Sequence, residues 1–131
     1  MNVQKPFWQE IGESFIQVYY RQFDTTDRRC MAELYSDKAF MTWEGTSYAG
    51  REEIIGKLTA LPFKSIEHVV TVQDIQPTVD SCILATVIGQ LKADNDHVMG
   101  FHQMFLLKHH GQDRWACTND IFRLALHNIA A

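Results

Sequence analysis

Hydrophobic residues recur at helical spacing in the first half of the chain. Residues 4 to 24 carry apolar side chains on one stripe, at positions 8, 11, 15, 19 and 23, which predicts an amphipathic helix with one buried face. Pro6 suits the first turn of this helix, where its missing N–H costs nothing. A short second helix is predicted over 27–35 and a third over 51–61, because Pro62 ends the third pattern.

The hydrophobic period changes to two from Ser65 onward. Turn-forming residues divide this half into four predicted strands, 65–76, 82–93, 98–109 and 114–126. Two shorter strands, 39–43 and 46–49, precede them around a turn at Glu44-Gly45. Helices followed by a meander predict one α+β domain over residues 1–131. We expect a cone-like, curved antiparallel sheet wrapped around the long N-terminal helix, with two shorter helices.

Both faces of the predicted sheet are substantially apolar. On strand 98–109, one face carries Met99, Phe101, Phe105 and Leu107, and the other carries Met104 and Leu106. On strand 114–126, strict alternation sets Phe122, Leu124 and Leu126 opposite Trp115, Cys117, Ile121 and Ala125. One layer of helices covers one face only, so the second face needs another cover. We therefore predict a symmetric homodimer that forms through the sheet.

The composition narrows the class of protein. The 131 residues fit one domain, with 46% hydrophobic and 21% charged residues, as in an ordinary globular protein. The net charge of -4 argues against nucleic acid as the main partner. No apolar stretch is long enough to span a bilayer, and the N-terminus has no apolar segment typical of a signal peptide. We therefore expect neither membrane insertion nor secretion.

Cysteines and histidines predict no cofactor or metal site. Three cysteines, at positions 30, 82 and 117, form no CxxC pair, which indicates reduced thiols in a cytosolic or nuclear protein. The six histidines are scattered, and the chain lacks HExxH, GxGxxG, GxxxxGK[ST] and GxSxG. We expect the thiols to act as small buried hydrophobic groups.

Two loops combine carboxylates with apolar residues at the ends of predicted strands. Trp43-Glu44 closes one strand, and Asp94 and Asp96 lie in the turn after another. Taken singly, these are a core tryptophan and ordinary turn residues. If the loops meet, they form a hydrophobic pocket with a negative rim that steers a cationic partner. Such a pocket suits a partner that presents one aromatic side chain flanked by Lys or Arg.

Phe7 and Trp8 start the first helix. Neighbours on a helix point about 100° apart, so the two rings cannot both be buried on one face. We therefore expect one of the two rings to be exposed. Trp8 is either core packing or, if exposed near a dimer seam, a binding hot spot.

A small-molecule enzyme is the alternative. It needs a carboxylate base of raised pKa and an oxyanion donor, for which Glu44 with Tyr35 or Tyr48 is the candidate set. Asp120 is the one internal carboxylate, and we expect it to pair with Arg123 or with backbone groups.

Several segments are similar to the nuclear transport factor 2 family, over essentially the whole chain. They are residues 8–20 (WQEIGESFIQVYY), 42–45 (TWEG), 61–63 (LPF), 73–74 (QD), 76–78 (QPT), 89–94 (GQLKAD), 100–108 (GFHQMFLLK) and 117–128 (CTNDIFRLALHN). The resemblance implies a homodimeric carrier. Family members bind the GTPase Ran in its GDP form and bring it into the nucleus through nuclear pores. They cross by touching Phe-Gly repeat nucleoporins, so cytoplasm, nucleus and nuclear envelope are implied.

The resemblance also implies roles for single residues. The Ran-binding positions of the family fall on Trp43, Glu44, Asp94 and Asp96, with His68 nearby. An aromatic side chain from the switch II segment of Ran is implied to enter the pocket, with basic neighbours facing the carboxylates. Trp8 matches the aromatic residue that contacts Phe-Gly motifs near the dimer seam, and Pro6 and Phe122 are its weaker companions.

The chain departs from the family pattern at three places. Residues 25–30 follow no family pattern, Ile121 replaces an expected Met, and Asn95 replaces an expected acid. The Ile121 change bears on dimer packing, and the Asn95 change removes one negative charge from the rim. A third hypothesis is an adaptor module of a larger RNA-export protein that pairs with a second chain. The absence of a linker before Ala131 favours a stand-alone protein.

Overall fold

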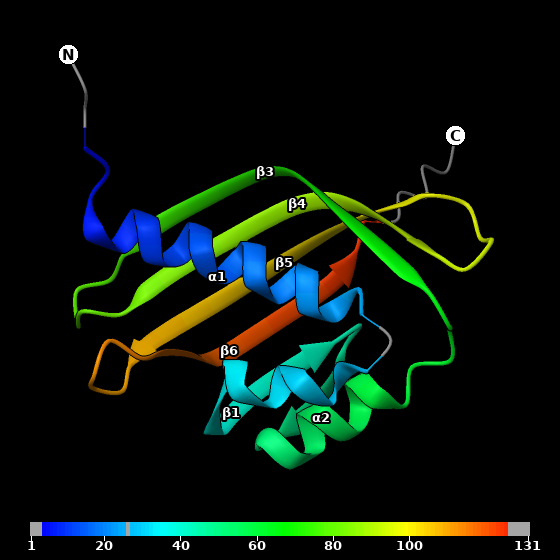
Figure 1. Ribbon diagram of the computed structural model, residues 1–131, viewed down its shortest axis with the longest axis horizontal. Helices are drawn as coiled ribbons and strands as arrows, with labels where there is room; N and C mark the ends of the chain where they lie inside the picture. The colour runs from blue at the N-terminus through cyan, green and yellow to red at the C-terminus, as the bar shows by residue number, and fades with distance from the viewer. Residues whose placement is uncertain (1–3, 26, 126–131) are drawn as a thin grey trace.

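The computed structural model describes residues 4–25 and 27–125 as three helical elements and one curved sheet (Figure 1). The elements are α1 (Phe7–Phe23), the 3-10 helix η1 (Arg28–Leu34), β1 (Tyr35–Trp43), β2 (Thr46–Ala49), α2 (Arg51–Thr59), β3 (Ile66–Pro77), β4 (Ile83–Ala93), β5 (Met99–His109) and β6 (Trp115–Leu124). The six strands lie in the order β2-β1-β6-β5-β4-β3. α1 crosses the concave face of the sheet, and η1 and α2 lie beside it over β1. The predicted α+β class is confirmed.

α1 buries the stripe that its sequence predicts. Phe15, Tyr19 and Phe23 are buried, and Trp8 and Ile11 are half-buried against the core. The helix begins at Phe7, three residues later than predicted, because Pro6 has an extended backbone with ψ 152°. Its carbonyl oxygen accepts hydrogen bonds from the N–H groups of Gln9 and Glu10 at 3.0 and 3.2 Å. Pro6 is therefore the cap of the helix rather than part of its first turn.

The sheet is mixed, which corrects the predicted all-antiparallel arrangement. β1 runs parallel to β6, so Thr42 lies beside Ile121 and Trp43 beside Phe122. Alternation of apolar residues identifies a strand but does not record which non-consecutive strand becomes its neighbour. β1 also begins at Tyr35 rather than at residue 39. η1 and α2 both pack against β1.

A bulge in β6 changes which side chains face inward. Leu106 lies opposite Asn119 and Leu107 lies opposite Cys117, so Thr118 is the extra residue. Cys117 and Phe122 therefore both face the core, with 0% and 2% exposure, whereas Ile121 faces outward with 42% exposure. The prediction that Cys117 shares a face with Ile121 is wrong, because one extra residue shifts the alternation.

The outer face of the sheet stays apolar in the single chain. Its exposed side chains include Phe40, Val69, Val72, Ile88 and Ile121. The second apolar face is thus confirmed, while the dimer that would cover it stays a prediction. Leu126, also expected in this strand, lies outside the described residues. None of the helices within 4–25 and 27–125 is long and apolar enough to cross a membrane.

Candidate functional site

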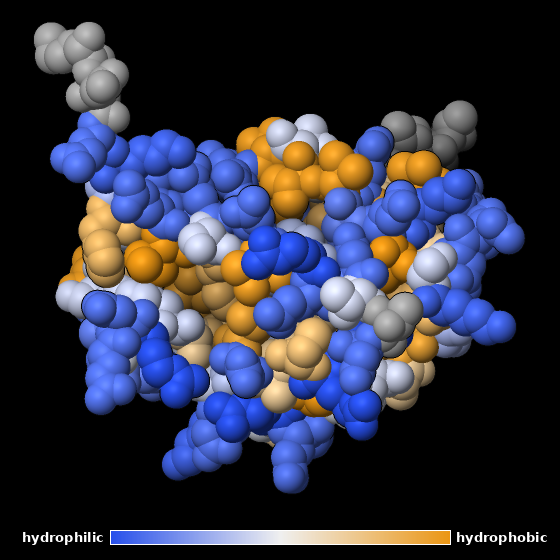
Figure 2. All heavy atoms as spheres, in the orientation of Figure 1, coloured by the Kyte–Doolittle hydropathy of each residue, from blue (hydrophilic) through white to orange (hydrophobic). Residues whose placement is uncertain are grey.

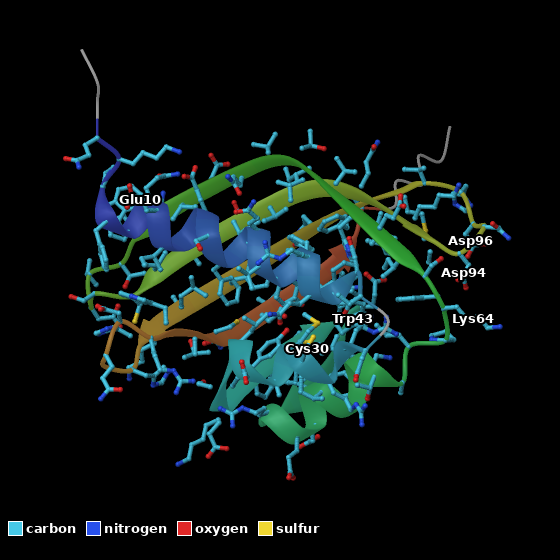
Figure 3. All side chains as sticks on the ribbon, in the orientation of Figure 1. Glu10, Cys30, Trp43, Lys64, Asp94 and Asp96 are labelled. Carbon is cyan, nitrogen blue, oxygen red and sulfur yellow. The ribbon has the colours of Figure 1, made fainter. Side chains whose placement is uncertain are left out.

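The two predicted site loops leave the strands at the same end of the sheet. β1 is parallel to β6, and β4 and β6 are both antiparallel to β5. β1, β4 and β6 therefore point the same way, and the loops after Trp43 and Ala93 emerge together. Figure 3 shows Trp43, Asp94, Asp96 and Lys64 toward this end of the molecule. The topology thus brings both loops to one end of the sheet, while their meeting around a shared pocket stays a prediction.

The floor of the site is Trp43, the half-buried member of a stack of aromatic rings whose other members, Phe23, Phe101 and Phe122, are buried. The rings of Trp43 and Phe122 stack with centroids 4.0 Å apart and planes 15° apart. Trp43 also stacks on Phe23 at 5.9 Å, and Phe122 stacks on Phe101 at 5.8 Å. Trp43 is half-buried, so part of its side chain is exposed to solvent. Half-buried Leu61, Phe63, Met99 and Leu124 pack against the same core as these rings, and the sequence analysis did not place them at this site.

Glu44 is held in place at the rim. Glu44 and Gly45 have φ of 50° and 88°, as a two-residue hairpin turn between β1 and β2 requires. The N–H of Glu44 donates to the carbonyl oxygen of Phe122 at 3.0 Å. Its carboxylate accepts a hydrogen bond from the N–H of Leu124. Glu44 is exposed, but its backbone and its side chain are both hydrogen-bonded to β6. It is therefore more ordered than a turn residue that contacts only solvent.

Asp94 joins the β4–β5 turn to the segment before β3. Its Oδ1 accepts hydrogen bonds from the N–H groups of Lys64 and Ser65 at 3.0 and 2.9 Å. These bonds, that from Ser65 first, lower the pKa of Asp94, so the carboxylate stays charged at neutral pH. Asp96 is exposed in the same turn, and its N–H donates to the carbonyl oxygen of Ala93 at 3.0 Å. This turn therefore carries at least one fixed negative charge at the end of the sheet where Trp43 also lies.

His68 lies beneath the site rather than on its rim. Its side chain is 2% exposed, and Nδ1 lies 2.6 Å from Asp24 Oδ1. The backbone N–H of His68 donates to Asp24 Oδ2 at 3.0 Å. The imidazole packs against Tyr20 and Phe23 with centroids 4.8 and 4.9 Å away. His68 can thus support the aromatic floor but cannot meet a partner directly in this arrangement.

Arg28 was missed because Arg28-Arg29 reads as a solvated basic pair. The side chain is buried, with 7% exposure, and Nε donates to the carbonyl oxygen of Leu58 at 2.7 Å. Its guanidinium lies 5.1 Å from the centre of the Phe63 ring and 5.7 Å from that of Phe23. This cation–π contact ties η1 to the aromatic residues behind the site. No sequence pattern signals such burial.

Asp120 is sealed inside the cone, and its expected pairing with Arg123 is wrong. Oδ2 accepts hydrogen bonds from the hydroxyls of Tyr35 and Tyr19 at 2.6 and 3.2 Å, and Oδ1 accepts one from Gln103 Nε2 at 2.8 Å. Burial raises the pKa of Asp120 to about 6, although these hydrogen bonds oppose the shift. Arg123 is exposed because it faces the other side of the strand.

The predicted Phe-Gly residues are divided between the two ends of α1. Pro6 is exposed and Trp8 is half-buried at the start of the helix. Phe23, which contacts Trp43, is at the last turn, about 22 Å farther along the axis at the usual rise per residue. Phe122 is stacked on Trp43 there. Within one chain, the structure therefore does not bring Phe122 to Trp8. The exposed member of the Phe7-Trp8 pair is Phe7, with 61% exposure.

The polar groups of the described residues form no obvious metal centre. Within 4–25 and 27–125, no group of three or more His, Cys, Asp or Glu side chains is placed to hold a metal ion. Cys82 and Cys117 are buried thiols as expected, whereas Cys30 is exposed.

Comparisons with known proteins agree on one family. Residues 11–124 match the nuclear transport factor 2 domain. The chain is 40% identical over 128 residues to the probable nuclear transport factor 2 of Caenorhabditis elegans, which covers 94% of this chain and 96% of that protein. It is 35% identical over 116 residues to nuclear transport factor 2 of Saccharomyces cerevisiae, which covers 87% and 91%.

A solved structure shows the same arrangement. Nuclear transport factor 2 from Cryptosporidium parvum superimposes with a TM-score of 0.86 at 31% identity, covering 95% of this chain and 99% of that one. With the family domain spanning most of the sequence, these relatives decide the assignment: the chain belongs to the nuclear transport factor 2 family.

Proposed function

We propose that this nuclear transport factor carries Ran in its GDP form into the nucleus and crosses the pore by binding Phe-Gly repeat nucleoporins. The observation that carries the proposal is the stacked pair Trp43–Phe122 at a sheet edge where Glu44 and Asp94 are both held by backbone hydrogen bonds. An apolar floor beside held carboxylates matches a partner that combines one aromatic side chain with cationic neighbours.

The chemistry of the rim supports selectivity as well as affinity. Hydrogen bonds between a carboxylate and Lys or Arg are stronger than neutral ones. A partner without the matching cations would leave these carboxylates desolvated and unpaired, which costs affinity. Because Glu44 and Asp94 are already ordered by the Leu124 and Lys64–Ser65 N–H groups, binding loses little of their conformational freedom.

Discrimination between GDP and GTP forms does not require contact with the nucleotide. A GTPase rearranges its switch segments when the γ-phosphate is present. A pocket that accepts one aromatic side chain and its basic neighbours reads the shape of such a segment. The site therefore favours the nucleotide state in which that aromatic residue is accessible.

The first turn of α1 supports the Phe-Gly function. Trp8 is half-buried, so it is fixed in place and keeps a face for a ligand, and Pro6 and Phe7 beside it are exposed. Single Phe-Gly contacts are expected to be weak and to gain strength from their number, which keeps transit fast. The cytoplasm, the nucleus and the nuclear pore are the expected locations.

The outer face of the sheet supports a homodimer. Met104 on β5 lies directly beside Ile121 on β6, and the exposed side chains of Val69, Val72 and Ile88 continue the apolar surface. A second copy would cover this face by the same residues on both sides, which a two-fold axis allows. Such a dimer places two Ran sites on one carrier.

The enzyme alternative has less support. Asp120 has the raised pKa of a catalytic acid, but it is 1% exposed and both its oxygens accept hydrogen bonds. Tyr35, a candidate oxyanion donor, already donates to Asp120. These groups form a closed network that orders the core, while the open site carries only rim carboxylates. The relatives are named nuclear transport factors, and we propose that this chain is not an enzyme.

Calorimetric titration with Ran tests the main proposal. We expect heat with the GDP form, with a stoichiometry near one Ran per chain, and none with the GTP form. Equal heat with both forms would remove the import direction from the proposal. Absence of heat with either form would overturn the assigned partner.

A further inference from the structure

An apolar hollow lies on the side of α1 that faces away from β3. It measures about 200 Å³ and lies between the helix, η1 and the β5–β6 end of the sheet. Its walls are Ile11, Ser14, Phe15, Val18, Leu34, Asp113 and Trp115. Figure 2 shows hydrophobic side chains at the bottom of a depression below the N-terminal half of α1, with polar residues above it. The hollow is remote from the Trp43 site and opens to solvent.

Trp115, which lines the hollow, carries a polar group that lacks a partner. Nε1 of Trp115 is buried, and no hydrogen-bond acceptor reaches it from the part of the chain that the structure describes. The indole N–H is a donor only, and when buried it usually finds an acceptor. A buried donor without an acceptor costs free energy, so a ligand that offered a carbonyl oxygen here would relieve that cost.

Aromatic rings continue from the hollow onto the surface. The ring of Phe7 lies against Trp115 with centroids 6.1 Å apart, and Trp115 lies against His109 at 5.0 Å. Phe7 is 61% exposed although it is a large apolar side chain. Exposed aromatic rings beside a pocket are typical of protein-binding hot spots.

We propose that this hollow is a second docking site for Phe-Gly repeats, in which one phenylalanine side chain fills the space between α1 and Leu34. On binding, the Trp115 indole turns so that Nε1, which is buried in the free chain, donates a hydrogen bond to a backbone carbonyl oxygen of the segment, and Phe7 packs over that segment. The inference rests on the proposed function and adds a site distinct from Trp8 and Pro6.

Size and polarity favour this occupant. A cavity of about 150 Å³ lined by apolar groups holds benzene, so 200 Å³ suits one phenyl ring. A glycine next to that phenylalanine lets the peptide backbone approach the indole closely, because it has no Cβ. A charged side chain would lose its hydration against Ile11, Val18 and Leu34.

The three tryptophans allow a site-resolved test. In ¹⁵N-labelled protein, Trp8, Trp43 and Trp115 each give one indole N–H signal, and a Trp115→Phe variant identifies the third. We would titrate with a peptide of Phe-Gly motifs joined by Ser-rich spacers, and with the same peptide in which Ala replaces every Phe. The Trp115 signal is expected to move with the first peptide and to stay with the second.

A matched pair of variants separates this site from the rest of α1. Ser14→Glu places a charge in the wall of the hollow, and Gln17→Glu adds the same charge to the same helix outside it. Both positions are exposed, so both variants should fold. Ser14→Glu should weaken the affinity read at Trp115 by about tenfold, as at an interface hot spot, and Gln17→Glu should leave it unchanged.

The outcomes distinguish the inference from the proposed function. Movement of the Trp8 signal without Trp115 would overturn the second site and leave the Phe-Gly function standing. Silence of both signals would overturn both. Movement of Trp115 that is equal with the Ala peptide, or that is unaffected by Ser14→Glu, would also overturn the second site.

Discussion

Trp43 and Phe122 stack face to face, with ring centroids 4.0 Å apart, across the parallel pairing of β1 and β6. The contact joins residues far apart in the sequence, at the end of the sheet where the acidic turn also emerges. Phe122 is thereby buried against Trp43 and supports the proposed Ran site. The resemblance had instead implied that Phe122 contacts Phe-Gly motifs.

Reversing the charge of Glu44 should abolish tight Ran binding. The proposed partner brings cations to this rim, so Glu44→Lys sets like charges together and should cost roughly 2–5 kcal/mol of binding free energy. Calorimetry with Ran-GDP measures the loss. Glu52→Lys, at an exposed position of α2, is the control for net charge and should bind normally. Affinity within threefold of wild type in Glu44→Lys would show that the site is misassigned.

Two substitutions of Asp94 should separate its charge from its structural role. Asn keeps an oxygen for the N–H groups of Lys64 and Ser65 and tolerates the left-handed φ of 49°. Asp94→Asn should therefore weaken Ran-GDP binding while the Tm stays close to that of wild type. Asp94→Ala removes charge and acceptor together, so both the affinity and the Tm should fall. An identical drop in Tm for both variants would contradict this division.

Removing the Trp8 ring should affect nucleoporin binding alone. Trp8 is at the opposite end of α1 from the Trp43 cluster, so Trp8→Ala should weaken Phe-Gly binding by about 2 kcal/mol or less. Ran-GDP affinity, measured on the same preparation, should be unchanged. A parallel loss of both activities would instead point to a folding defect, which circular dichroism would reveal.

A charge on the outer sheet face should separate the proposed dimer. Ile121 is 42% exposed and lies beside Met104, and Ile121→Lys would bury an unpaired ammonium group in an apolar interface. Light scattering should report twice the monomer mass of 15.1 kDa for wild type and one monomer mass for the variant. Ala60→Lys adds the same charge at the exposed end of α2 and should stay dimeric. A dimeric Ile121→Lys protein would place the interface elsewhere.

Stability should fall with rising pH because of Asp120. Burial raises the pKa of this carboxyl from its ordinary 3.8 to about 6. Between these values the folded state holds the proton that the unfolded state releases, so the free energy of unfolding decreases as pH rises. The contribution is fully present below about pH 4 and lost above about pH 6, and it amounts to about 3 kcal/mol.

Asp120→Asn cannot titrate, so it isolates this effect from other carboxyls whose pKa values are lowered, such as Asp27 and Asp94. Urea unfolding of both proteins from pH 4 to pH 7 should show wild type losing stability relative to the variant. A constant difference across that range would mean that the buried carboxyl does not titrate there.

Much of the fold follows from local patterns. The spacing of Phe15, Tyr19 and Phe23 predicted the buried face of α1, since a helix repeats every 3.6 residues whatever surrounds it. The alternation from Ser65 onward predicted the four long strands, and the Glu44-Gly45 turn was readable from its residue types. The resemblance carried by these segments also pointed to the family.

The site could be predicted only in part. Trp43, Glu44 and Asp94 were predicted as site residues because carboxylates beside apolar residues stand out in a turn, and their role stays a prediction. Leu61, Phe63 and Met99 carry no such signal, since apolar residues near strand ends are common in any core. Arg28 was missed for the opposite reason, because a basic residue in a polar segment is usually exposed.

The sequence by itself determined most of the elements, the buried face of α1 and the family, because these depend on residues close together in the chain. The tertiary structure alone decided that β1 pairs with β6, that a bulge at Thr118 turns Cys117 inward, and that Phe122 lies under Trp43. Each depends on contacts between segments far apart in the chain. Their register follows from how the whole core packs, which no local pattern records.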